Sequence, residues 1–434
     1  MKSALEKFQN LEKSRLIRSG VELLLVVVTF LMLIWPHLRR VDAVLLSGKE
    51  AYYHLQEGTV AVILTFLNQY TNLDILFLAK TVPIILGLAS MLIFYNILRN
   101  LKINYAVVVL STLILIFSPS FIYLFGTLNA YAFMSFIILL ALYLFIIKKG
   151  FLGVALLYLL PFFSIWSTLL ALLLVLIYSL KRKRFRLFLG ALPSLAIFYF
   201  YTTKTLPSYG SRIISDFGGD YGLGIFIVML SFLGLQYLWR KKYRYISVYL
   251  MIASIILFAF FDMRILSYLN FILVTLAALG LIDLMKLQWR NELIKKLSAL
   301  IIINGFIFSG LSYITYVSFD LPNEDIIEMA EYLRTLPDGN VFSHISREPW
   351  IDYSGKTFVT DKNLFYVTDI QKASVIIDAK QIKYIWLDKE LEQKIWTGEE
   401  EGLQFLLEYS KKFQKKKITN YVTLWEVEQY DISD

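Results

Sequence analysis

Eleven long apolar segments dominate this chain of 434 residues. They lie at residues 20–37, 80–98, 104–124, 128–147, 151–163, 165–180, 187–203, 222–239, 245–261, 264–284 and 297–317. A helix needs about 20 apolar residues to cross the hydrocarbon core of a bilayer, and a soluble domain does not need so many apolar side chains. With 57% hydrophobic residues, the chain is expected to be a polytopic α-helical membrane protein of about eleven spans.

Basic and acidic residues alternate between successive connections of these segments. One set of connections is rich in Lys and Arg, as in "KRKRFR" from Lys181 and "RKKYR" from Arg240. The other set is poor in basic residues and holds acids: Asp42, Glu50, Asp216, Asp220 and Asp262. By the positive-inside rule the basic set is cytoplasmic, so the formal net charge of +9 reports topology, and no nucleic-acid partner is expected.

Three regions outside the spans follow from this arrangement. Residues 1–19 are expected to be a cytoplasmic amphipathic segment, and 38–80 a long first outer loop within the membrane domain 20–317. Residues 318–434 change composition, and stretches such as "NVFSHI", "KTFVTD" and "KYIWLD" predict strands that alternate with helices. We therefore expect an integral plasma-membrane protein with a cytoplasmic N-terminus and a C-terminal extracytoplasmic α/β domain.

The first outer loop carries "SGKEAYYHLQ", from Ser47 to Gln56. Its tyrosines and histidine fit an aromatic belt at the headgroup layer, with a solvated acid beside them. They equally fit a catalytic carboxylate, Glu50, at the membrane surface. The chain as a whole has no cysteine, which excludes disulfides and thiolate metal sites. It also has no glycine-rich phosphate loop with a lysine, which excludes P-loop chemistry.

An acid, one residue and then "YYHL" resembles the first outer loop of archaeal oligosaccharyltransferase catalytic subunits. These belong to the GT-C superfamily of membrane glycosyltransferases, which use sugars linked to lipid phosphates. The resemblance implies that Glu50 matches the family's catalytic or metal-binding aspartate, with Tyr53 and His54 beside it in the cavity. Asp216, before a glycine-rich turn, matches a second acid of the family, although a solvated loop would look the same.

The resemblance also implies a site for the donor phosphate. Arg264 lies at the outer end of a span, where an arginine either reaches the headgroups or binds an anion. In the family an arginine in this context faces the active cavity, so Arg264 is the first candidate for the phosphate, with Arg212 and Lys204 as second choices.

The sequence departs from the family in two places, one that concerns the acceptor and one that concerns a metal site. The outer domain matches through Trp350, Ile351, Tyr353, Gly355 and Asp361, a register that replaces the family's sequon-reading "WWDYG" by roughly "SHISRE". An alignment of "WIDY" from Trp350 with "WWDYG" is the alternative, and the first register is preferred because its spacing to Val359 and Asp361 fits. Asn129 stands where the family has an acid that completes a metal site. Glu50 and Asp216 alone would make a poor site for a divalent cation such as Mg²⁺ or Mn²⁺, so a metal cofactor is left open.

The sequence thus predicts an inverting GT-C transferase at the outer membrane face. It would move a sugar from a polyprenyl- or dolichyl-phosphate donor to a glycan, lipid or protein acceptor, with Glu50 as general base. Two alternatives stay open: an oligosaccharyltransferase that acts on protein asparagine, and a non-catalytic relative or lipid–glycan transporter.

Overall fold

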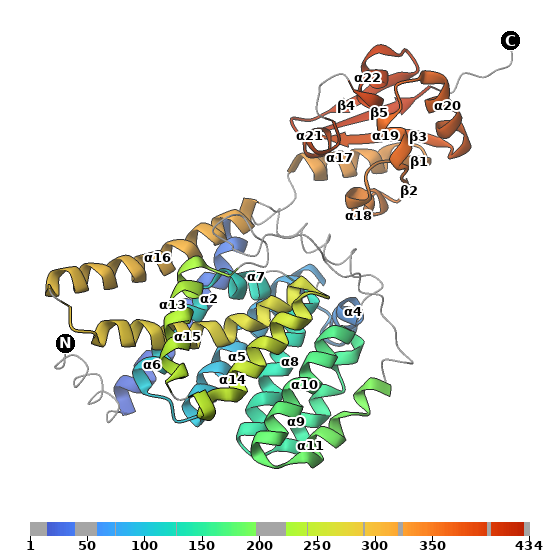
Figure 1. Ribbon diagram of the computed structural model, residues 1–434. Helices are drawn as coiled ribbons and strands as arrows, with labels where there is room; N and C mark the ends of the chain where they lie inside the picture. The colour runs from blue at the N-terminus through green and yellow to red at the C-terminus, as the bar shows by residue number, and fades with distance from the viewer. Residues whose placement is uncertain are drawn as a thin grey trace, which may run out of the picture. The chain divides into compact units, whose positions relative to one another are not determined.

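The computed structural model describes residues 15–39, 59–73, 75–126, 128–196, 223–240, 242–289, 291–319, 324–396 and 401–428. These residues form two compact units, one that is entirely helical up to residue 319 and one that contains a β-sheet from residue 324 (Figure 1). The predicted combination of apolar helices with a C-terminal sheet is confirmed.

The helical unit follows the apolar segments of the sequence. Its elements are α2 Arg15–Arg39, α4 Thr59–Thr71, α5 Ile75–Asn100, α6 Tyr105–Ile116, α7 Pro119–Gly126, α8 Ala130–Ile146, α9 Gly150–Leu157, the 3-10 turn η1 Leu160–Phe162, α10 Ile165–Arg182, α11 Phe185–Ala191, α13 Ile225–Trp239, α14 Lys242–Ala259, the 3-10 turn η3 Met263–Ile265, α15 Leu266–Lys286 and α16 Glu292–Phe319.

Each of the predicted apolar segments contains helix, but the helices differ in length. Within the described ranges, four helical stretches are long and apolar enough to cross a membrane: Lys80–Asn100, Ile165–Arg182, Met263–Lys286 and Glu292–Thr315. The pair α6 and α7 would make a fifth, and the other segments are shorter apolar helices. The number of spans and their orientation therefore remain predictions.

Local residue choices explain two irregular features of this unit. The chain bends by 60° between α6 and α7, where Pro119 disfavours a helical conformation for Ser118. Ser118 is buried, and its Oγ accepts a hydrogen bond of 2.7 Å from Asn270 Nδ2 in α15. The predicted loop 38–80 contains the helix α4 and also the first residues of α5. Helix α5 begins at Ile75, five residues before the apolar segment that the sequence predicts from Lys80.

Helices α13 and α15 pack with no side chain between them at one point. A Cβ added at Gly234 would overlap the carbonyl of Leu276, and one added at Gly280 would overlap the carbonyl of Leu230. Small residues permit this backbone-to-backbone approach, which is characteristic of helices that associate in membranes. The crossing fixes α13 against α15, the helix that follows Arg264.

The second unit is built around a five-stranded sheet of order β2-β1-β3-β5-β4. Strand β1 pairs in parallel with β2 and β3, whereas β5 pairs antiparallel with β3 and β4. The elements are α17 Glu324–Thr335, β1 Asn340–Phe342, the turn η4 Ile345–Arg347, α18 Glu348–Tyr353, β2 Thr357–Val359, α19 Lys362–Tyr366, α20 Ile370–Ala379, β3 Ile382–Asp388, α21 Lys389–Ile395, α22 Gly402–Tyr409, β4 Phe413–Ile418 and β5 Val422–Val427.

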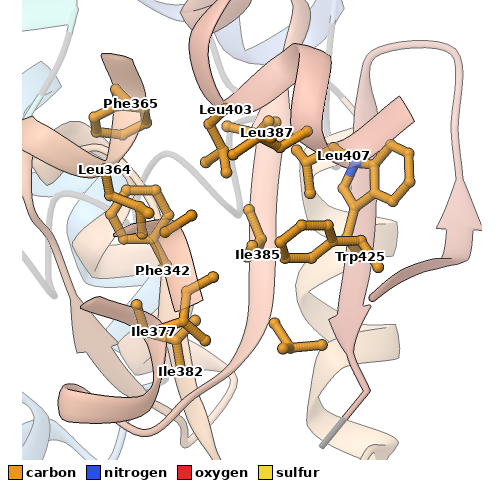
Figure 2. Close-up of a cluster of buried hydrophobic side chains, with 14 of the residues drawn as sticks. Phe342, Leu364, Phe365, Ile377, Ile382, Ile385, Leu387, Leu403, Leu407 and Trp425 are labelled. Atoms are coloured by element: carbon orange, nitrogen blue, oxygen red, sulfur yellow. The ribbon is translucent and has the colours of Figure 1, made fainter. Parts of the chain in front are cut away.

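Alternation along the strands gives the sheet two apolar faces. Phe342, Ile385, Leu387 and Trp425 lie in one core with residues of α19, α20 and α22 (Figure 2). Their strand neighbours point to the opposite face and pack against α17 and α18: Val341, Tyr384, Trp386 and Leu424. A period of two with both faces covered by helices is the pattern of a three-layer α/β domain.

The sequence prediction for this unit differs from the structure in two places. The sequence predicts one helix over "GEEEGLQFLLEYSKKF", but α22 ends at Tyr409, and Phe413 opens the edge strand β4, where its side chain is buried against the sheet. The strand predicted over "NVFSHI" ends at Phe342, so His344 lies beyond it. The sequence predicts a final strand or hairpin arm over "ITNYVTLWEVE", which the structure confirms as β5, whereas its antiparallel partner β4 is not predicted.

Candidate functional site

Most of the predicted site residues lie outside the described part of the chain. This holds for Glu50, Tyr53 and His54 of the first outer loop, and for Lys204, Arg212 and Asp216 of the loop before α13. Their predicted roles therefore stay predictions. Arg264 and Asn129 are described, and both have defined partners.

Arg264 is held by a buried carboxylate two residues before it. Its Nε lies 3.0 Å from Asp262 Oδ1, and its Nη2 lies 3.2 Å from Asp262 Oδ2. The same Oδ1 accepts the backbone N–H of Arg264 at 3.2 Å, so Asp262 also caps η3. Two-point contacts of this kind fix the plane of a guanidinium, and here they set it at the beginning of α15.

A tyrosine from α8 completes this group. The Tyr131 hydroxyl donates a hydrogen bond to Asp262 Oδ2, and the Arg264 guanidinium carbon lies 4.8 Å from the centre of the Tyr131 ring. The carboxylate thus receives donors from two elements and is only 1% exposed, while 23% of the Arg264 side chain is exposed. The arginine is the accessible member of a pair whose acid is sealed from solvent.

Tyr268 extends the polar group toward α10. Its hydroxyl lies 3.0 Å from Ser167 Oγ, and its ring centre lies 6.2 Å from that of Tyr131. We call Tyr131, Ser167, Asp262, Arg264 and Tyr268 the η3 cluster. A buried polar network of this kind rigidifies the helices that carry it, because each broken hydrogen bond would leave an unpaired group in an apolar region.

The sequence places Arg264 at the beginning of an apolar segment, where the structure has a helix, but it does not predict the partners of Arg264. Asp262 was counted only as an acid of the outer loops, although its spacing of two residues from Arg264 was visible in "FDMR". Tyr131, Ser167 and Tyr268 lie in three different apolar helices, and nothing in their local sequence distinguishes them from other aromatic or small polar residues. Packing between helices brings Tyr131 and Ser167 to the cluster, whereas Tyr268 follows Arg264 four residues later in the sequence.

Asn129, which replaces a family acid, has a structural role. Its Oδ1 accepts the N–H of Ala132 at 2.9 Å and so caps α8, while its Nδ2 donates to the carbonyl of Leu124 in α7 at 3.0 Å. A carboxylate could make the first contact but not the second. Among the described residues no group of three or more His, Cys, Asp or Glu side chains could hold a metal ion.

The outer-domain residues that carried the family pattern are also mainly structural. Trp350 and Ile351 of α18 are buried in the core against α17, and Gly355 adopts φ +75°, which favours glycine. Asp361 caps α19, and Lys380 Nζ lies 3.1 Å from its carboxylate. Although burial raises it, the hydrogen bonds from Lys380 and from backbone N–H groups keep the pKa of Asp361 below its usual range.

No protein-family model matches the sequence, and no curated protein matches it in sequence. The fold does have similar solved structures. The Archaeoglobus fulgidus oligosaccharyltransferase, tethered to an acceptor peptide with an NVT sequon, matches with a TM-score of 0.60 at 10% identity, over 86% of this chain and 69% of that one. The chain has the fold of an archaeal oligosaccharyltransferase.

Two further structures of oligosaccharyltransferases from Archaeoglobus fulgidus agree. Its apo form matches with a TM-score of 0.55 at 10% identity, over 86% of this chain and 70% of the other. AglB from Archaeoglobus fulgidus, in complex with an inhibitory peptide and a dolichol-phosphate, matches with a TM-score of 0.50 at 11% identity, over 95% and 74%. The resemblance stated from "YYHL" and Arg264 is thus confirmed at the level of the fold.

Proposed function

We propose that this protein is a GT-C type membrane glycosyltransferase that takes a sugar from a polyprenyl- or dolichyl-phosphate donor. The observation that carries the proposal is the fold shared with an archaeal oligosaccharyltransferase over most of the chain. A match over 86% of the residues includes parts of both units. One of the matched structures holds a dolichol-phosphate, which is the donor chemistry proposed here.

The proposed reaction is a direct displacement at the anomeric carbon. Glu50 takes the proton of an acceptor hydroxyl, and the oxygen forms a bond to the anomeric carbon of the sugar. The bond from that carbon to the phosphate oxygen breaks at the same time, and the lipid phosphate leaves with the electron pair. The anomeric configuration is inverted.

Arg264 is proposed to hold the lipid phosphate, because a fixed guanidinium stabilises the charge that develops on the leaving group. Asp262 would orient Arg264 rather than bind the donor, since its carboxylate is buried and its oxygens accept from Arg264 and Tyr131. Lys204 and Arg212 are proposed as further phosphate ligands, and Tyr53, His54 and Asp216 as cavity residues. If the reaction uses a divalent cation, Glu50 and Asp216 are its proposed ligands.

Transfer to protein asparagine is the second candidate. The similar structure with a tethered NVT peptide favours it, whereas the replacement of "WWDYG" by roughly "SHISRE" favours a different acceptor. A peptide with an Asn-x-Thr sequon, offered with lipid-linked donor, separates the two. Glycosylation of the peptide would establish the asparagine acceptor, and its absence alongside transfer to a hydroxyl acceptor would establish the first candidate.

Glu50→Gln tests the core of the proposal. A general base contributes about 10²–10⁴-fold to a rate, so membranes that contain this variant should lose at least about 100-fold in transfer from the lipid-linked donor. Glu57→Gln, which removes a like charge from the same loop, is the matched control and should retain activity. Full activity of Glu50→Gln would remove the proposed mechanism.

A further inference from the structure

An apolar cavity of about 240 Å³ lies between α8, α10 and α14, away from the η3 cluster. Its walls include Ala141 and Phe145 of α8, Ala171 and Val175 of α10, and Met251 of α14. Phe145, Val175 and the polar end of the lining at Lys181, Arg182 and Ser247 lie in the halves of the helices next to the basic connections, and Ala171 and Met251 lie near the helix midpoints. The η3 cluster lies near the opposite ends of α8, α10 and α14. The cavity is therefore a feature separate from the proposed active site.

Two hydrogen bonds fix the walls of the cavity. Tyr178 of α10 donates from its hydroxyl to the carbonyl of Phe145 in α8 at 2.9 Å, and the two rings stack with centres 5.6 Å apart. Lys181 of α10 donates from Nζ to Ser247 Oγ of α14 at 2.7 Å. Side chains thus join α10 to both neighbours, which keeps the cavity open between them.

The polar end of the cavity is basic. Lys181 and Arg182 belong to its lining, and both side chains are exposed at the end of α10. From Ala171 to Arg182 the helix rises by roughly 16 Å, about half the thickness of a hydrocarbon core. The cavity therefore combines an apolar interior, of a depth that suits part of an acyl chain, with two cations at the level of the headgroups.

Charge around this end is of one sign. The chain has no Asp or Glu between Asp74 and Asp216, nor in α14, so no acid occurs in any of the helices that line the cavity. The basic run continues through Lys183, Arg184 and Arg186. The positive-inside rule explains why these connections are basic, but it does not explain why an apolar cavity ends at two of the basic side chains, Lys181 and Arg182. Basic pockets between transmembrane helices bind anionic headgroups.

We propose that this cavity binds one anionic phospholipid, with an acyl chain among Ala141, Ala171 and Met251 and its phosphate at Lys181 and Arg182. Lys181 approaches the phosphate while it remains hydrogen-bonded to Ser247, since an ammonium has three donors. The site requires only that the end of α10 lies at a headgroup layer, and it is independent of the proposed transferase activity.

Native mass spectrometry of the full chain tests this site. The protein is reconstituted in bilayers with equal amounts of phosphatidylglycerol and phosphatidylcholine of identical acyl chains, then released gently. One phosphatidylglycerol should stay bound. Lys181→Gln with Arg182→Gln should weaken its binding about 30-fold, from roughly 1 kcal/mol for each cation. Lys183→Gln with Arg184→Gln, a matched pair outside the lining, should change it less than about threefold.

Three results would overturn the proposal. The first is equal retention of the two lipids, and the second is an equal loss from the matched pair, which would show diffuse attraction to the whole basic run. The third is competition by inorganic phosphate alone, which would make the site one for a free anion. Ala171→Phe fills the apolar part and should abolish lipid retention. If this variant does not fold, the charge variants at exposed positions still decide the question.

Discussion

Each unit of the molecule contains a two-point arginine–aspartate pair with a buried acid, and the two pairs differ in what they join. In the helical unit Asp262 holds Arg264 across two residues of one turn. In the sheet unit Arg347 Nε lies 2.6 Å and its Nη2 3.3 Å from the oxygens of Asp388, across 41 residues. One pair shapes a local turn, and the other ties a loop to the end of β3.

Exposure separates the two arginines as well. The side chain of Arg347 is 11% exposed, whereas that of Arg264 is 23% exposed beside an equally buried acid. Asp388 also accepts the N–H of Leu391 at 2.9 Å, so it caps α21. The comparison indicates that the Arg347 pair holds the domain together, while the Arg264 pair orients an arginine whose outer surface can meet a ligand.

The largest expected effect is on the sheet unit. Asp388→Ala would leave the Arg347 guanidinium buried without its acid and would remove the cap of α21, which should cost about 3–5 kcal/mol in local stability. Hydrogen exchange of the amides in β3 and β5 of the full chain should accelerate accordingly. Unchanged protection of these amides would contradict a structural role for the pair.

The second effect is mainly on activity. Arg264→Gln should lower transfer from the lipid-linked donor about 100-fold, the typical loss on removing one donor to a developing charge. The variant also leaves the buried Asp262 carboxylate without its cation, so hydrogen exchange at the start of α15 should accelerate as well, although Asp262 keeps its contacts with Tyr131 and with the backbone of η3.

Arg264→Lys sharpens this second test. It keeps the charge but not the planar two-point geometry, so activity should fall although the charge is conserved. If Arg264→Gln instead left activity intact and loosened α15, the two pairs would be alike, and Arg264 would have only a structural role.

A smaller effect is expected at Asn129. Asn129→Asp keeps the acceptor that caps α8 but removes the donor to Leu124, so the link from α7 to α8 should weaken by about 1 kcal/mol. The measurement is the thermal midpoint of the protein in detergent. A gain in stability that depends on added Mg²⁺ or Mn²⁺ would instead show that the position can still complete a metal site.

The smallest effect concerns a second acid near Asp388. Burial, and then the nearby carboxylate of Asp388, raise the pKa of Glu392. When the pKa of an acid is higher in the folded state than in the unfolded state, the folded protein becomes less stable as the pH rises from the unfolded pKa through the folded one. Glu392→Gln removes this ionisation and should therefore stabilise the sheet unit near pH 7. The gain should vanish below about pH 4, where the acid is protonated in both states. A gain that is equal at both pH values would point to another cause.

Apolar runs and strand periodicity predicted the apolar helices and the C-terminal sheet, because most of these elements are specified by neighbours close in sequence. The edge strand β4 is the exception, since its start was predicted as helix. The site was harder to predict. Arg264 is recognisable as a charge at the end of an apolar segment, but its setting depends on Tyr131, which comes from α8, far from Arg264 in the chain. The cavity beside α10 had no signal beyond its basic end, since Ala141 and Ala171 resemble any other small residue of an apolar helix.

The glycine crossing of α13 and α15 has an evolutionary consequence. Lipid accepts Leu, Ile, Val or Phe almost equally, so most surface positions of these helices are free to drift. At Gly234 and Gly280 only a hydrogen atom fits against the opposing carbonyl. Among descendants of this chain, these two positions should therefore change least and change together, and even alanine, elsewhere the mildest replacement, should be selected against.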